Sequence, residues 1–218
     1  MARKNQRRPQ PPAREPGDAG PGTVRIVGGE FRGRKLRYSG DERTRPMKDR
    51  VREAVFNLLT TSVKGTHAID LFAGTGALAF EALSRGAERA TLIECHFPTV
   101  AVIRENARTL QVEERVEIVG ADTFYWIAHH ADLGPLPQTI FVAPPYEFFV
   151  TRADEMRALI ARCLTEAPSG SRIMVESDSR FDTGELPDAE QWDVREYPPA
   201  VVSIYRKPAS TSPSAAPA

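Results

Sequence analysis

Cysteine is scarce in this sequence, since only Cys95 and Cys163 occur among 218 residues. Two cysteines are too few for a disulfide-stapled fold, which favours a reducing, cytoplasmic location. Long apolar runs are also missing, because no segment approaches the roughly 20 apolar residues that span a bilayer. The first residues are basic and have no apolar core. We therefore expect neither a membrane span nor a secretory signal.

The chain also has no net charge, because 29 Lys and Arg residues balance 29 Asp and Glu residues. A nucleic-acid-binding protein usually carries a basic surplus. The charges are distributed unevenly along the chain, however. Residues 1–60 hold 15 basic and 7 acidic residues, whereas residues 61–218 hold 14 basic and 22 acidic residues. This asymmetry indicates a basic N-terminal part that can contact a polyanion, followed by an acidic remainder.

Composition divides the chain into four segments. Residues 1–22 are rich in Pro, Gly and Arg, and residues 207–218 in Pro, Ser and Ala, so we expect both to be disordered tails. Residues 23–64 are expected to form an N-terminal extension of a β-hairpin and a helix. Residues 65–206 have the length of a single ligand-binding domain.

The extension and the domain have different patterns. Val24–Tyr38 alternates loosely around a glycine-rich middle, which predicts a hairpin with a bulge, and Pro46 is expected to open a helix as its first residue. Further along, short apolar strands alternate with helices. We expect strands at 67–72, 90–94, 115–119, 139–143 and 172–176, helices at 76–85, 99–110, 123–130 and 149–166, and antiparallel strands at 192–197 and 201–206. The predicted class is α/β, with a mostly parallel sheet covered on both faces and closed by an antiparallel hairpin.

A glycine-rich turn gives the strongest local signal. The apolar strand ending at Asp70 runs into Gly74-x-Gly76 and then into a helix, and Glu94 ends the next strand. Such a turn lets a ligand approach the backbone, and the carboxylate can bind ribose hydroxyls, as in a dinucleotide site. Asp70 instead favours S-adenosylmethionine, because a carboxylate in the turn repels a pyrophosphate but suits a cationic sulfonium. The lack of a second, substrate-binding domain favours the same cofactor.

The motif Ala143-Pro-Pro-Tyr146 follows the fourth of these strands and resembles the D/N-P-P-Y/F signature of methyltransferases that act on exocyclic amines. The amine of a base is a poor nucleophile because its lone pair is delocalised into the ring. In the signature, a side-chain oxygen and a proline carbonyl accept hydrogen bonds from the amine, and the aromatic ring stacks on the base. Ala143, Pro144, Pro145 and Tyr146 are therefore the candidate catalytic residues.

The whole chain resembles the bacterial small-subunit ribosomal RNA guanine-N2 methyltransferases, the RsmD-like family. The resemblance lies in the stretches at 25–36, 44–57, 70–77 and 144–146. It implies a seven-stranded, Rossmann-like class I methyltransferase fold, S-adenosylmethionine as the cofactor, and small-subunit rRNA or an assembling 30S particle as the partner. We expect a monomer, because an RNA enzyme of this size can work as one. By position, the resemblance implies a cofactor site made of Asp70, Phe72, Gly74, Gly76, Glu94 and Asp122, with Glu94 on the ribose and Asp122 on the adenine amine.

The basic N-terminal part is the expected RNA-binding surface. Its cations lie on the predicted hairpin and helix, where they can contact phosphates while the target base leaves its stack. The candidate RNA-binding residues are Arg25, Arg32, Arg34, Lys35, Arg37, Arg45, Lys48 and Arg52. No metal site is predicted, because the adjacent His129 and His130 point in different directions on a helix.

Ala143 departs from the family's pattern, which has Asp or Asn at this position. A methyl group accepts no hydrogen bond, and losing one such bond in the transition state costs about 2–4 kcal/mol unless another group replaces it. Glu147 or a water molecule are the candidate replacements. The alternative hypotheses are a cofactor-binding RNA-binding or assembly protein without chemistry, a methyltransferase for another target, and, as the weakest, an NAD-dependent enzyme.

Overall fold

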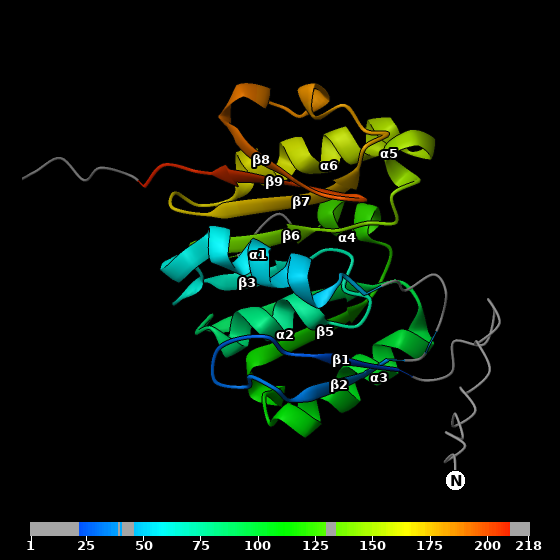
Figure 1. Ribbon diagram of the computed structural model, residues 1–218, viewed down its shortest axis with the longest axis vertical. Coiled ribbons are helices and arrows are strands. Elements are labelled where there is room, and N and C mark those ends of the chain that lie inside the picture. The colour runs from blue at the N-terminus through cyan, green and yellow to red at the C-terminus, as the bar shows by residue number, and fades with distance from the viewer. Residues whose placement is uncertain (1–21, 39, 41–45, 130–133, 210–218) are drawn as a thin grey trace, which may run out of the picture.

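The computed structural model describes residues 22–38, 40, 46–129 and 134–209, and its centre is a seven-stranded sheet (Figure 1). The strand order is β5-β4-β3-β6-β7-β9-β8, in which only β9 is antiparallel to its neighbours β7 and β8. The strands are β3 (His67–Asp70), β4 (Arg89–Glu94), β5 (Val116–Gly120), β6 (Gln138–Val142), β7 (Arg172–Asp178), β8 (Trp192–Tyr197) and β9 (Ala200–Arg206). The predicted sheet with an antiparallel C-terminal hairpin is confirmed.

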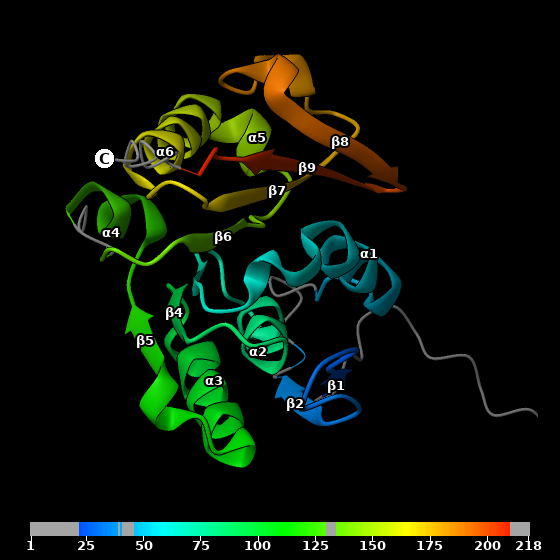
Figure 2. The same ribbon diagram turned by 90° about the vertical axis from the view of Figure 1, so that its left-hand side faces the viewer.

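Helices cover both faces of the sheet (Figure 2). One face carries α1 (Asp49–Leu59), α2 (Ala77–Ser84) and α3 (Phe97–Leu110), and the other carries α4 (Thr123–His129), α5 (Phe148–Thr151) and α6 (Ala153–Glu166). Short 3-10 helices lie at Thr60–Val63, Glu113–Arg115, Thr183–Glu185 and Ala189–Gln191. Within the described residues, no helix is both long and apolar enough to cross a membrane.

Alternation along the strands divides the interior into two apolar clusters. In β6, Ile140 and Val142 belong to the cluster under α4 and α6, whereas Phe141 belongs to the cluster under α1, α2 and α3. All five residues of β6 are buried. A strand buried on both faces needs apolar residues at consecutive positions, which explains why these strands read as short continuous runs in the sequence.

The N-terminal extension packs into the same core as the domain. Its strands β1 (Gly22–Arg25) and β2 (Lys35–Tyr38) pair with a continuous register, so the expected bulge is absent from these paired residues, and the glycines lie in the connecting loop. Gly29 has φ 73°, and a Cβ there would lie 2.0 Å from the carbonyl oxygen of Ser84 in α2. The hairpin therefore sits directly against α2, where Phe31 is buried in the shared cluster.

Two predicted helix boundaries are wrong. Helix α1 begins at Asp49, not at Pro46, because Lys48 has an extended backbone with ψ 141°. The single helix expected over 149–166 is broken at Arg152, whose backbone leaves the helical region at φ −131°. The Arg152 guanidinium lies 3.8 Å from the centre of the Phe124 ring and pairs with Glu155, so tertiary contacts fix the break.

The expected tails largely fall on residues 1–21 and 210–218, which lie outside the described residues. Two of their inner positions belong to the folded domain. Gly22 begins β1, and Lys207 donates from its backbone to the Ser171 oxygen at 3.0 Å and from Nζ to the Leu164 oxygen at 2.7 Å. The domain thus extends slightly beyond both of the boundaries expected from composition.

Candidate active site

The candidate site lies at the carboxyl edge of the parallel strands, where the strand order reverses. Strand β3 pairs with β4 on one side and with β6 on the other, so chain connections leave this point in opposite directions. Ligands of open α/β sheets bind in the crevice at such a switch point. The loops after β3, β4, β5 and β6 meet here, and these loops, together with the last residues of β3 and β4, carry all of the predicted cofactor and catalytic residues.

The glycine turn after β3 is held by Glu94. The Gly74 N–H donates to Glu94 Oε2 at 2.9 Å, and the His96 N–H donates to Oε1 at 2.7 Å. Gly76 has φ 75°, and a Cβ there would lie 2.6 Å from the Phe80 ring, so the helix α2 can begin here only with glycine. Each Glu94 oxygen keeps a lone pair, so the carboxylate can accept further hydrogen bonds from a ligand.

Asp70 is a buried carboxyl that is poorly compensated by its surroundings. It ends β3 beneath the turn and is 1% exposed, and no described donor approaches Oδ1 or Oδ2 with the distance and angle of a full hydrogen bond. Burial raises the pKa of Asp70 from 3.8 to about 7; nearby Glu94 raises it as well, while the backbone N–H groups of Ala79 and Phe72 act in the opposite direction. An uncompensated buried acid next to an open turn fits a cationic ligand.

Phe72 belongs to an aromatic cluster, and Asp122 lies two residues before Phe124, another member of that cluster. Phe72 contacts the rings of Phe124 and Phe148, with centroid distances of 5.9 and 6.2 Å. Asp122 is exposed and caps helix α4 by accepting from the Tyr125 N–H at 3.0 Å. Its other oxygen lies 3.7 Å from Arg152 Nη1. Both residues are thus at the carboxyl edge of the sheet, and both also have structural contacts.

Phe97 is a candidate ligand-binding residue that the sequence reasoning missed. Its side chain is 71% exposed, although it is a large apolar ring at the start of α3. The ring lies against the end of β5, because a Cβ on Gly120 would be 3.1 Å from its Cε1 atom. Part of the ring therefore contacts the end of β5 and most of it is exposed, so that a planar ligand held by the nearby carboxyl edge could stack on it. Its position three residues after Glu94 was the available signal.

The Ala143–Tyr146 motif follows β6 directly. Pro144 is buried, and Ala143, Pro145 and Tyr146 are half-buried. The Tyr146 hydroxyl donates to Glu176 Oε1 at 2.7 Å. Glu176, in β7, is 8% exposed, and burial raises its pKa, whereas the bond from Tyr146 lowers it.

Glu176 was also missed by the sequence reasoning. The signal was the one used for Glu94, a carboxylate near the carboxyl end of a strand. Glu147, the residue named earlier as a replacement for the absent acceptor, is exposed instead.

Six of the predicted RNA-binding cations have exposed side chains at the outer surface of the extension. Several of them also contact the protein: Arg25 pairs with Asp49 at 3.2 Å, Arg37 pairs with Glu105, and Arg34 donates to the last carbonyls of α3. The exposed residues are Arg25, Arg32, Arg34, Lys35, Arg37 and Lys48. Arg45 lies outside the described residues.

Arg52 is not an exposed cation, and its prediction as an RNA-binding residue is wrong. Its side chain is fully buried, and it donates to the Met47 oxygen at 3.0 Å, to the Arg25 oxygen and to Asp49 Oδ1 at 2.9 Å. Its Nε lies 3.8 Å from Oε2 of Glu81, which is equally buried in α2. Arg52 thus ties the extension to the domain.

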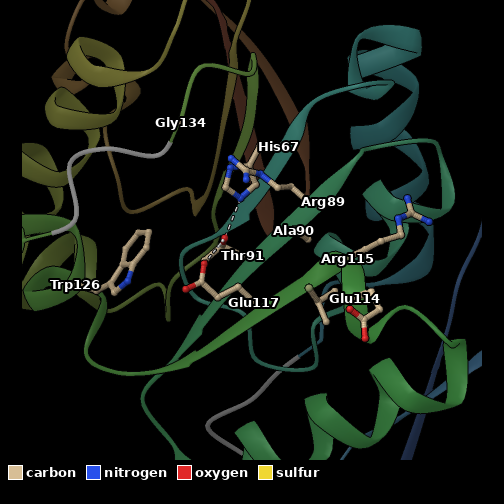
Figure 3. A pocket seen from close by; sticks show the side chains of 10 residues that line it. His67, Arg89, Ala90, Thr91, Glu114, Arg115, Glu117, Trp126 and Gly134 are labelled. Atoms are coloured by element: carbon tan, nitrogen blue, oxygen red, sulfur yellow. Dashed lines mark hydrogen bonds between the residues drawn. The ribbon is translucent and has the colours of Figure 1, made fainter.

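A pocket of about 450 Å³ lies at the opposite edge of the sheet, at the amino ends of β3, β4 and β5 (Figure 3). There His67 Nε2 lies 2.9 Å from the Thr91 hydroxyl, which donates to Glu117 at 3.2 Å. This pocket contains none of the predicted site residues. Across the described part of the chain, no three His, Cys, Asp or Glu side chains group as metal ligands.

A family model described as "Conserved hypothetical protein 95" matches residues 24–206. The chain belongs to this family. It is 38% identical over 133 residues to "Ribosomal RNA small subunit methyltransferase D" of Escherichia coli strain K12, covering 61% of this chain and 65% of that protein. The protein of the same name in Haemophilus influenzae is 35% identical over 128 residues, which cover 58% of this chain and 66% of that protein. The matched region thus spans slightly less than two thirds of these relatives.

The fold also matches a solved structure, "Putative methyltransferase yhhF from Escherichia coli", with a TM-score of 0.70 and 29% identity. The match covers 87% of this chain and 100% of that one. The resemblance to the RsmD-like family and the expected Rossmann-like methyltransferase fold are therefore both confirmed.

Proposed function

We propose that this protein is an S-adenosylmethionine-dependent rRNA methyltransferase that methylates the exocyclic N2 of a guanine in small-subunit rRNA. The observation that carries the proposal is the juxtaposition of two loops. Strands β3 and β6 are neighbours, with Asp70 opposite Phe141, so the glycine turn and the Ala143–Tyr146 motif begin side by side at one edge. A cofactor bound on the first loop then faces a base bound on the second.

The residues of the turn fit S-adenosylmethionine. Asp70 offers an uncompensated negative group beneath a ligand that carries a sulfonium and an ammonium, Glu94 can accept from ribose hydroxyls, and the open Phe97 ring can stack on adenine. Asp122 can accept from the adenine amine through its exposed carboxylate. When bound, the cofactor supplies an electrophilic methyl group.

The chain's own residues orient the amine. The Pro144 carbonyl can accept a hydrogen bond from one N2 hydrogen, and the Tyr146 ring, held by its hydroxyl on Glu176, can stack on the base. Pro145 and Ala143 shape the loop on either side of Pro144. Fixing the ring plane aims the N2 lone pair along one direction, which is the contribution that positioning makes to such a reaction.

The exposed cations of the extension are placed to hold RNA. They lie on the hairpin and at the start of α1, on the face of the sheet toward which Ala143 points. Their contacts with phosphates would fix the register of the RNA without reading its sequence. The proposed partner is small-subunit rRNA, free or in an assembling 30S particle, bound by a monomer.

The test is methyl transfer from labelled S-adenosylmethionine to 30S subunits and to naked rRNA, both from a strain that lacks this protein. We expect label in one guanine N2, located by nuclease mapping, and none in subunits from the parent strain. No transfer by a protein that binds the cofactor would refute the proposal. It would favour the second candidate, a non-catalytic RNA-binding assembly protein, which Ala143 alone supports.

A further inference from the structure

Ala143 leaves one hydrogen of the target amine without the side-chain acceptor of the related motifs. The register of the sheet shows which residue lies beside it. Strand β6 runs parallel to β7, with Phe141 opposite Met174 and Val142 opposite Val175. One step further along both strands, Ala143 comes opposite Glu176. Neighbouring residues in a parallel register lie about 4.8 Å apart in the hydrogen-bonding direction.

The two side chains also point to the same face of the sheet. Val142 and Val175 both belong to the cluster under α6, whereas Phe141, Met174 and Ala143 all contact the cluster under α1 and α2. Because strand side chains alternate, Glu176 follows Met174 onto that second face. The small Ala143 side chain therefore leaves space on the face where the Glu176 carboxylate lies.

The carboxylate is held with one oxygen still available. Glu176 Oε1 accepts from the Tyr146 hydroxyl at 2.7 Å, and Oε2 receives no hydrogen bond from a described residue. The residue is only 8% exposed, and a carboxylate buried to this extent with a single donor has unused acceptor capacity. Tyr146 thus anchors the Glu176 carboxylate, and the register of β6 and β7 brings Glu176 beside Ala143.

We propose that Glu176 is a catalytic residue that accepts the hydrogen bond from the target amine which an Asp or Asn at position 143 would accept. This inference rests on the proposed function. The amine nitrogen forms its bond to the methyl carbon with its lone pair, the carbon–sulfur bond breaks, and that electron pair stays on sulfur. The nitrogen then carries an extra proton, which passes to the Glu176 carboxylate and from there to solvent. Pro144 holds the other hydrogen.

The decisive variant is Glu176→Met in the full-length protein. Met has a similar length and volume but no oxygen that can accept from the substrate amine, whereas a Gln amide could flip and still present one. We expect kcat to fall about 100-fold, the range found for losing one transition-state hydrogen bond, with the Kd for S-adenosylmethionine changed less than twofold. The matched control is Glu147→Gln, which removes the exposed carboxylate beside the motif and should leave kcat within twofold.

The double variant Ala143→Asp/Glu176→Met separates catalysis from structure. The carboxylate introduced at position 143 would restore an acceptor on the same face, so kcat should recover at least tenfold relative to Glu176→Met alone. Unchanged kcat in Glu176→Met, or no recovery in the double variant, would overturn the role of Glu176 while methyl transfer by the wild-type protein still stands. An inactive wild-type protein would overturn the proposed function itself, and the role of Glu176 with it, whether or not Ala143→Asp is active.

Discussion

Replacing Asp70 with Asn should stabilise the cofactor-free protein while it weakens cofactor binding. Asp70 is fully buried, receives no full hydrogen bond from a described donor, and has a pKa of about 7 in the folded state against 3.8 ordinarily. The folded state therefore binds the Asp70 proton more tightly than the unfolded state does. The unfolding free energy is not reduced by Asp70 below pH 4, where the group is protonated in both states. It falls as the pH rises toward 7, and it stays at the lower value above pH 7.

The magnitude follows from the two pKa values. The difference between 3.8 and about 7 corresponds to a destabilisation of about 4 kcal/mol above pH 7 and about 1.5 kcal/mol at pH 5. Asn does not ionise and fills the same volume, so Asp70→Asn should remove most of this penalty. The gain in unfolding free energy should be about 2–3 kcal/mol larger at pH 8 than at pH 5.

Urea unfolding at pH 5 and pH 8, without cofactor, measures this difference directly. Asp154→Asn is the matched control, because that carboxylate is 96% exposed and its loss should change stability by less than about 0.5 kcal/mol at either pH. Titration with S-adenosylmethionine should show weaker binding to Asp70→Asn. An equal or smaller unfolding free energy for this variant at pH 8 would refute the view that Asp70 is uncompensated in the free protein.

Three further changes probe the extension and the cofactor edge. Arg52→Met should lower the unfolding free energy by about 3 kcal/mol, measured by urea unfolding, because it breaks a buried ion pair with Glu81; an unchanged value would contradict the tie between extension and domain. The pair Arg32→Glu with Lys35→Glu should weaken rRNA binding and flatten its dependence on salt in filter-binding titrations, without changing thermal stability; salt-independent binding by the wild-type protein would argue for a different substrate. Phe97→Ala should raise the Kd for S-adenosylmethionine about fivefold or more in calorimetry, and equal affinity would exclude Phe97 from the adenine site.

The parallel sheet, and the cluster of site residues at its carboxyl edge, could be predicted from the sequence alone. Strands such as β6, buried on both faces, need consecutive apolar residues, and these runs are visible without any tertiary information. Asp70, Gly74 and Glu94 were placed in one site because they lie at the ends of two successive strands around a glycine-rich turn. Boundaries fixed by distant contacts were not predictable: the break before α6 depends on Arg152 lying over Phe124, in a different helix.

Arg52 shows the same limit for charged residues. It was expected among the exposed cations of the basic N-terminal part, because an arginine in such a segment is usually solvated. One of its acceptors is a carbonyl of β1, and the buried carboxylate that lies 3.8 Å from its Nε belongs to Glu81 in α2, 29 positions further along the chain. No pattern within the N-terminal part indicates that this guanidinium is buried near Glu81. Counting every cation of that part therefore overestimated the positive charge that it exposes to RNA.

The proposed role of Glu176 follows from a property of sheets that motif matching does not use. A motif describes consecutive residues on one strand. Compared with the motif, Ala143 only removes the side-chain acceptor that Asp or Asn would supply. In a parallel sheet, however, the residue at the matching register of the next strand points to the same face at a distance of about 4.8 Å, which is shorter than a glutamate side chain. A long carboxylate on β7 can therefore reach the space that a short one on β6 would occupy, provided that position 143 is small and another group holds the glutamate. Ala143 meets the first condition and the Tyr146 hydroxyl the second, so the substitution that weakens the motif on its own strand also makes room for an acceptor from the next one.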